Sequence, residues 1–170
     1  MPHNQQSLRL TDRYRERLIA TSATLESLAA QVWPTIDQLD GTRWAETLSR
    51  RVTQAQRDAV RATAAYLGAF LTLETGRRQN GPLLDSRRYA GVRRSGASLE
   101  ESFRSPLVGV LADLKAGVDQ AEALSRGLVK AKRIVGVDFD HAHRTALLEA
   151  IDSDERFEGW TRAVRGTCGA

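Results

Sequence analysis

The sequence predicts an all-α fold, an elongated antiparallel hairpin or bundle of long helices followed by a short irregular or β-containing C-terminal segment. Hydrophobic residues make up 41% of the 170 residues but aromatic residues only 6%, and strands favour the β-branched and aromatic residues that are scarce here. Apolar residues also recur every three or four positions over long stretches, which is the spacing of one helical face. The core must therefore be built largely from alanine, leucine and valine.

The length fits one domain, since about 150 residues is a usual domain size. We expect a helical domain over residues 1–157 and the start of a cysteine-containing segment over residues 158–170. The predicted helices of the first domain cover 12–33, 43–75, 99–116 and 118–151, and an arginine-rich connector covers 77–97.

The first two helices are predicted to pair. Thr11 is the expected N-cap of helix 12–33, because its hydroxyl can accept from free backbone N–H groups at a helix start. Helix 43–75 has apolar residues at helical spacing from Trp44 to Leu73. A rod of this length, about 50 Å at 1.5 Å per residue, needs a partner along its side. An antiparallel first helix is the nearest candidate.

The connector follows Gly76, which ends the second helix, and contains turn-forming residues and many arginines. Arginine binds carboxylates and phosphates alike, so the connector arginines are the candidates for contact with an acidic protein surface or with nucleic acid. A solvated connector is the simpler interpretation, because arginine clusters alone are weak motifs. The candidate contact residues are Arg77, Arg78, Arg87, Arg88, Arg93 and Arg94. The apolar residues that could dock the connector are Leu83, Leu84 and Tyr89.

The last two helices are separated by Gly117. Ser98 and Glu101 form a capping-box pattern before helix 99–116, and Pro106 either kinks that helix or opens a new first turn. Helix 118–151 contains two glycines, Gly127 and Gly136, each of which weakens a helix by about 1 kcal/mol relative to alanine. In the C-terminal segment, residues 161–164 alternate like a short strand.

The strongest candidate for catalysis is an apolar run that ends in Asp138 and Asp140. Haloacid-dehalogenase phosphatases use such a pair as nucleophile and acid/base, but Ala142 stands where that motif has Thr or Val, and the alternating strand-and-helix pattern is missing. His141 and His143 lie two apart, so on a helix they point in different directions. A polar patch on a helix is therefore favoured, and we predict no catalytic site, metal or cofactor.

The length of the apolar runs, the cysteine content and the distribution of charge limit the classes of protein that remain possible. No apolar run is long enough to cross a bilayer, so we expect no membrane contact. The lone Cys168 excludes an internal disulfide and agrees with a reducing compartment. The connector is basic whereas residues 138–158 are acidic, and this polarity favours head-to-tail contacts between copies of the chain.

The C-terminal region carries a specific string, Gly159-Trp160-Thr161-Arg162, which follows Arg144 and an acidic stretch and precedes Cys168. It resembles the signature of MuF-like minor head proteins from tailed phages of actinobacteria, in which an arginine-bearing helix leads into Gly-Trp-x-Arg and a Cys-x-x-Cys pair. The resemblance is concentrated in residues 141–170. The second cysteine would fall directly after Ala170, so we expect that the segment is truncated or that the pair was lost.

The resemblance implies a non-enzymatic minor capsid protein of a bacteriophage virion, with a role in head morphogenesis or in genome packaging and ejection. It would lie in the capsid interior or at the portal vertex, and in the host cytoplasm during assembly. The implied partners are the portal protein and neighbouring copies of the chain, and also the major capsid protein and packaged DNA. Two alternatives remain open: a helical DNA-binding protein of the virion that uses the connector, and a less favoured metal-dependent hydrolase that uses Asp138 and Asp140.

Overall fold

The computed structural model describes residues 5–35, 38, 42–91 and 96–157, and within these ranges the chain is helical, with no β-strand. The predicted all-α fold class is confirmed. The predicted C-terminal segment 158–170, including its strand-like residues, lies outside the described residues. In order, the elements are α1 (Gln5–Gln31), α2 (Thr42–Thr75), α3 (Ser86–Tyr89), α4 (Leu99–Lys115), α5 (Gln120–Ser153) and the 3-10 turn η2 (Glu155–Phe157).

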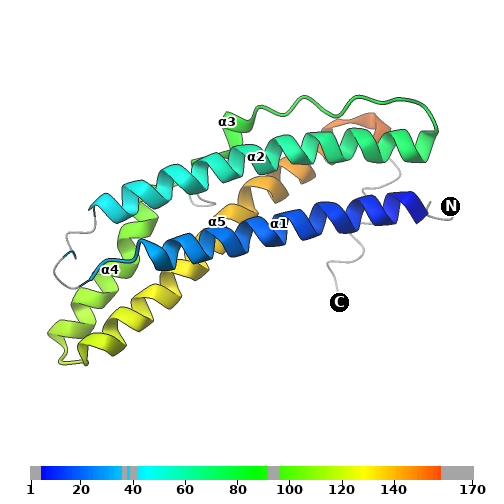
Figure 1. Ribbon diagram of the computed structural model, residues 1–170. Coiled ribbons are helices and arrows are strands. Elements are labelled where there is room, and N and C mark those ends of the chain that lie inside the picture. Colours follow the sequence, from blue (N-terminus) through cyan, green and yellow to red (C-terminus); the bar gives the residue numbers. More distant parts are fainter. Residues whose placement is uncertain (1–4, 36–37, 39–41, 92–95, 158–170) are drawn as a thin grey trace, which may run out of the picture.

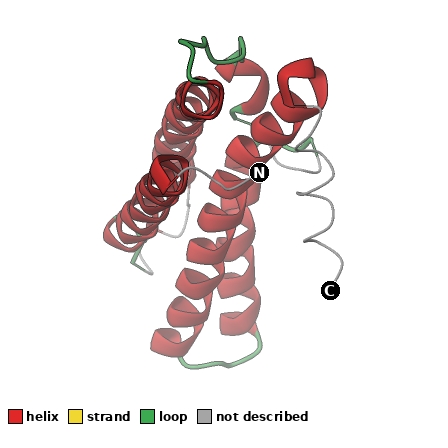
Figure 2. Cartoon of the chain, turned by 90° about the vertical axis from the view of Figure 1, so that its right-hand side faces the viewer, coloured by secondary structure: helices red, strands yellow, loops and turns green. Residues whose placement is uncertain are grey.

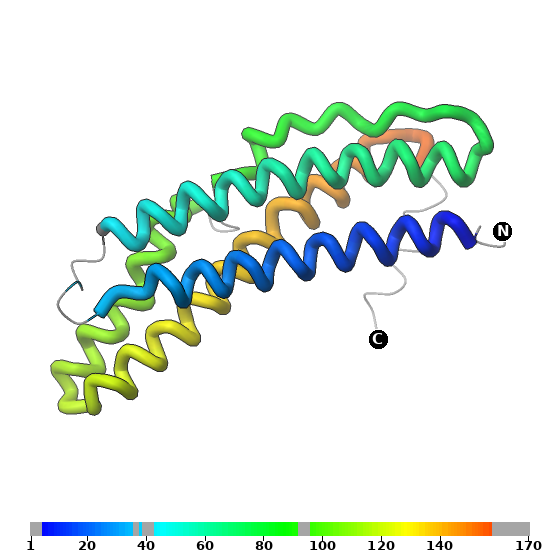
Figure 3. Tube along the Cα trace, in the orientation of Figure 1, coloured from blue at the N-terminus to red at the C-terminus, as the bar shows by residue number. Residues whose placement is uncertain are grey.

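The long helices form two layers. Helices α1 and α2 run side by side and antiparallel in one layer, and the α4–α5 hairpin forms the other (Figures 1 and 2). Helix α5 contacts α1, α2 and α4, so it holds the two layers together. The turn between α4 and α5 projects beyond the end of the α1–α2 layer (Figures 1 and 3).

Helix α1 begins at Gln5, earlier than the predicted range 12–33. The prediction of Thr11 as N-cap is therefore wrong: its hydroxyl lies inside the helix and donates to the Ser7 carbonyl at 2.9 Å. The early start has a tertiary cause, because Ser7 is buried and its hydroxyl donates to Glu74 near the end of α2. Packing against a neighbouring helix stabilises helical residues beyond what local propensity provides.

The other long helices agree closely with the predicted ranges. Gly76 follows α2 with φ of 66°, a left-handed conformation that ends a helix at little energetic cost for glycine. The Ser98 hydroxyl accepts from the Glu101 amide at 3.2 Å, as the capping box requires. Asp119 caps the start of α5, and Pro106 lies inside α4.

The main core lies where α1, α2, α4 and α5 meet. Trp33 and Trp44 pack edge to face with ring centroids 5.0 Å apart, and Trp44 meets Phe103 at 6.0 Å. Gly127 lies beside this cluster, and a Cβ added there would come within 2.3 Å of a Val110 methyl and 2.8 Å of the Trp33 ring. The glycine therefore lets α5 approach α4 closely, which offsets its low helix propensity.

The connector runs along α2 (Figure 1), and part of its backbone packs on that helix while its described arginines remain exposed. A Cβ added to Gly81 would lie 1.9 Å from the Ala64 carbonyl oxygen, and one added to Gly68 would lie 2.5 Å from the Gly81 nitrogen. Only glycine at both positions allows this contact between backbones. The amide of Gln79 also donates to the Thr72 hydroxyl of α2 at 2.9 Å.

The connector is also tied to α5 and η2. Arg156 of η2 donates to the Asn80 carbonyl at 3.0 Å. Tyr89 is buried and Leu84 is half-buried, as the docking prediction requires, but Leu83 is fully exposed. The connector therefore contacts α2 in one layer and both α5 and η2 in the other, and so links the two layers.

Candidate functional site

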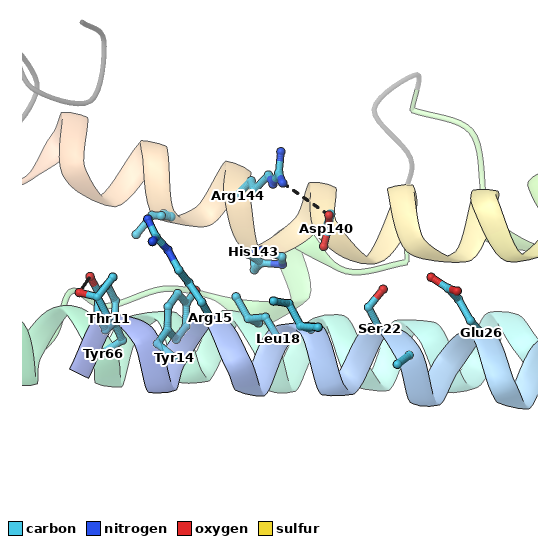
Figure 4. A pocket seen from close by; sticks show the side chains of 13 residues that line it. Thr11, Tyr14, Arg15, Leu18, Ser22, Glu26, Tyr66, Asp140, His143 and Arg144 are labelled. Atoms are coloured by element: carbon cyan, nitrogen blue, oxygen red, sulfur yellow. Dashed lines mark hydrogen bonds and ion pairs between the residues drawn. The ribbon is translucent and has the colours of Figure 1, made fainter. Parts of the chain in front are cut away.

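An open groove of about 600 Å³ lies between the stretch of α1 from Thr11 to Glu26 and the C-terminal half of α5 (Figure 4). We call it the α1–α5 groove. Its apolar wall is formed by Leu18, Ile19 and Ala23 of α1 and by Leu147 of α5. Ile19 is 69% exposed, so a large apolar side chain is available there to a partner.

The stretch of α1 that lines the α1–α5 groove also packs on α2. The rings of Tyr14 and Tyr66 stack with centroids 4.3 Å apart. The hydroxyl of Tyr14 lies 2.7 Å from the Thr63 hydroxyl, and that of Tyr66 lies 3.0 Å from the Thr11 hydroxyl. Burial raises the pKa of Tyr14, so its hydroxyl stays protonated at neutral pH. These contacts fix α1 against α2, and Thr11, Tyr14 and Tyr66 also line the α1–α5 groove.

The polar rim of the α1–α5 groove carries charges of both signs. Arg144 and Asp140 of α5 form an ion pair at 3.6 Å, and both side chains are substantially exposed. Figure 4 shows Arg15 extending from α1 toward α5, with Ser22 and Glu26 farther along the same helix. An apolar wall with a mixed polar rim is the usual composition of a protein–protein contact.

His143 faces the α1–α5 groove from α5 and is only 6% exposed. Burial lowers its pKa, and Arg144 acts in the same direction, whereas the charge of Asp140 opposes the shift. The charged side chains of α1 that line the same groove are Arg15 and Glu26. The folded protein therefore holds His143 neutral at neutral pH.

This histidine predicts that the protein becomes less stable below neutral pH. The unfolded chain takes up a proton near pH 6.5, whereas the folded chain does so only at lower pH. The free energy of unfolding should therefore fall as the pH drops through 6.5, and the fall should end below the folded-state pKa. Urea unfolding between pH 7.5 and 5 measures it.

The variant His143→Gln should flatten this slope, because it removes the buried group whose pKa is lowered. An unchanged slope in His143→Gln would contradict the assignment. Asp154 does not interfere, because the hydrogen bond from Arg156 lowers the pKa of its carboxyl and moves its titration further from this pH range.

The predicted contact arginines do not form one patch. Arg77 and Arg78 are exposed just after α2, and Arg87 is exposed on α3. Arg88 forms an ion pair with Glu149 of α5 at 3.1 Å and therefore helps to hold the connector in place. Arg93 and Arg94 lie outside the described residues.

Tyr89 strengthens the same link between the connector and α5. Its hydroxyl donates to the Glu149 carboxylate at 2.8 Å, and the Arg88 guanidinium lies over its ring, 5.5 Å from the centroid. Burial, together with the bond to Glu149, raises the pKa of Tyr89. Tyr89, Arg88 and Glu149 therefore act together to hold the connector against α5.

Of the predicted signature residues, only Arg144 is described, and it lies at the edge of the α1–α5 groove. The rest of the signature, Gly159, Trp160, Arg162 and Cys168, lies outside the described residues.

The two carboxylates of the catalytic hypothesis do not converge. Both lie on α5, where Asp138 is 3% exposed and Asp140 lines the α1–α5 groove beside Arg144. Residues two apart on a helix point in different directions. In the part of the chain that the structure describes, no three His, Cys, Asp or Glu side chains are grouped to hold a metal ion.

Sequence analysis missed Gln56, which is fully buried in α2. Its amide nitrogen donates to the Asp138 carbonyl of α5 at 2.8 Å, and its amide oxygen accepts from the Gly91 amide at 2.8 Å. One side chain thus joins α2, α5 and the connector. A signal was present, because Gln56 lies four residues after Val52 and four before Val60, on an apolar face.

Comparison of the chain with protein-family models, with curated proteins and with solved structures gave no match. Of the described helices, none combines the length and the apolar character that crossing a membrane requires. Function is therefore inferred from the residues and their geometry.

Proposed function

We propose that this chain is a structural, non-catalytic component of a tailed-phage head that docks on the portal. The observation that carries the proposal is the α1–α5 groove, in which an exposed isoleucine and an apolar wall lie on two long helices. Exposed apolar surface of this kind marks sites of protein association. The resemblance of the string around Trp160 to MuF-like minor head proteins supports the portal as the partner.

The α4–α5 hairpin offers a second apolar surface, which suits contacts with neighbouring copies or with the capsid. Val108 and Leu111 of α4 are 64% and 50% exposed, and Val129 of α5 is 67% exposed. The hairpin turn projects beyond the other layer, where a neighbour can reach it (Figure 1). Within the virion, the chain would occupy the capsid interior or the portal vertex.

The metal-dependent hydrolase receives no support from the geometry. A hydrolase of that type needs carboxylates that converge on one metal or one substrate atom. Here Asp138 is buried between helices and Asp140 is paired with Arg144. The arrangement of these residues therefore supports a surface that docks on a partner protein better than it supports a hydrolase site.

Co-sedimentation with the portal protein of the encoding genome tests the proposal. The variant Ile19→Glu places a charge in the apolar wall and should weaken portal binding at least about tenfold, the loss expected when a central apolar contact is removed. Because Ile19 is largely exposed, the variant should retain the helical circular dichroism of the unchanged chain.

Leu148→Glu is the matched control, since Leu148 is 50% exposed on α5 and does not line the α1–α5 groove. It should bind the portal as the unchanged chain does. Failure of the unchanged chain to bind under any assembly condition would refute the portal role. Equal binding by both variants would instead exclude this groove as the contact.

A further inference from the structure

A second groove, of about 560 Å³, lies on the α1–α2 seam where the connector leaves α2. We call it the arginine groove. Three arginines line it, Arg9 and Arg13 from α1 and Arg78 from the connector. Its floor is apolar and is formed by Leu10, Ala69 and Leu73.

Local structure fixes the three arginines in one place. Arg9 and Arg13 are four residues apart on α1, so they lie on the same side of the helix. Gly76 turns the chain back at the end of α2, and the bond from the Gln79 amide to Thr72 anchors the connector beside the groove. Arg78 is thereby held near two arginines that lie far away in the sequence.

Among the residues that the structure describes, no carboxylate lines the arginine groove. The nearest acids along the chain are Asp12 and Glu16 of α1 and Glu74 of α2, and Glu74 accepts a hydrogen bond from Ser7. Among the described residues, none of these acids forms an ion pair with the groove arginines. Like charges brought together without a counter-charge repel, so an anion bound between them would stabilise the arrangement.

We propose that the arginine groove binds the phosphates of a nucleic-acid backbone. Guanidinium groups match phosphate oxygens in two-pronged hydrogen bonds. A duplex supplies closely spaced negative charge, about one per 1.7 Å of its axis, which suits three arginines better than an isolated carboxylate does. Arg77 is exposed next to Arg78 and extends the basic surface.

The lining of the groove also indicates how the nucleic acid is recognised. None of the described residues that line it is aromatic, so this lining offers unpaired bases no ring on which to stack. The apolar floor suits the carbon atoms of the sugars, between the phosphates that the arginines hold. Binding should therefore depend on the backbone and not on base sequence. This inference is independent of the portal role, because the two grooves share no lining residue.

Fluorescence anisotropy with a labelled duplex, measured between 50 and 200 mM KCl, tests the inference. Three phosphate contacts predict an affinity about 40-fold lower at the higher salt, since each contact contributes about −0.9 to the slope of log affinity against log salt. The triple variant Arg9→Gln, Arg13→Gln, Arg78→Gln should lose most of this slope. A triple variant Arg50→Gln, Arg61→Gln, Arg104→Gln has the same net charge, changes exposed arginines elsewhere and should retain it.

Two results would overturn the inference. One is equal binding and equal salt slope in the two triple variants, because the groove would then make no specific contribution. The other is competition by poly-glutamate as effective as competition by DNA at equal charge concentration, which would identify an acidic protein as the ligand. Circular dichroism of both triple variants should match that of the unchanged chain, since all six arginines are exposed.

Discussion

Replacing Phe103 with alanine should lower the free energy of unfolding by about 3–5 kcal/mol, the usual loss for a buried phenylalanine. Phe103 is fully buried, and its ring lies against Trp44, which in turn packs on Trp33. Trp44 belongs to α2, and Trp33 lies in the segment just after α1. Because helices from both layers surround the ring, they cannot close the cavity without moving a whole helix.

Urea unfolding followed by tryptophan fluorescence and by circular dichroism measures this loss. Val108→Ala is the control on the same helix, since Val108 is 64% exposed, and it should change stability by less than about 1 kcal/mol. If Phe103→Ala were as mild as the control, α4 would not pack against the α1–α2 layer as described.

Gln56→Leu should lower the free energy of unfolding by about 2–4 kcal/mol. The part-buried Gly91 amide would lose its acceptor, a loss at the lower end of the range of about 1–3 kcal/mol for buried groups, and the buried bond to the Asp138 carbonyl would disappear as well. Leucine is close to glutamine in size, so the loss would come from the hydrogen bonds and not from an empty space.

The effect of Gln56→Leu should also be local. Hydrogen exchange at Gly91 should accelerate, because that amide is held by Gln56 alone among the contacts described for it. Gln54→Leu is the matched control: Gln54 is exposed two residues away and bonds only to Asp58 at the surface. Stability equal to that of the control would refute the bridging role of Gln56.

The helices could be predicted because each carries a long apolar face. The start of α1 could not, since residues 5–11 have no strong local signal and Ser7 is held by Glu74 across the layer. The packing of the connector was also unpredictable. It depends on the backbone contact between Gly68 and Gly81, and glycines without side chains leave no periodic pattern.

The candidate sites were harder to predict because they join residues from distant helices. The predicted first helix, 12–33, includes Tyr14 and Leu18, but only the structure shows that α5 lies across the groove from them. Arg78 was grouped with its neighbours in sequence, whereas its neighbours in space are Arg9 and Arg13. The helical interpretation of Asp138 was right, but its burial against α2 was not foreseen.

The central position of α5 has a consequence for biosynthesis. It contacts α1, α2, α3 and α4, and it is the last long helix of the described chain. On the ribosome, α1, α2 and α4 therefore emerge before the helix that completes their shared core. Until α5 follows, the apolar faces that carry Leu48, Val52 and Phe103 lack the part of their cover that α5 provides. Nascent chains should recruit chaperones during this interval, because exposed apolar surface is what makes incomplete folds aggregate.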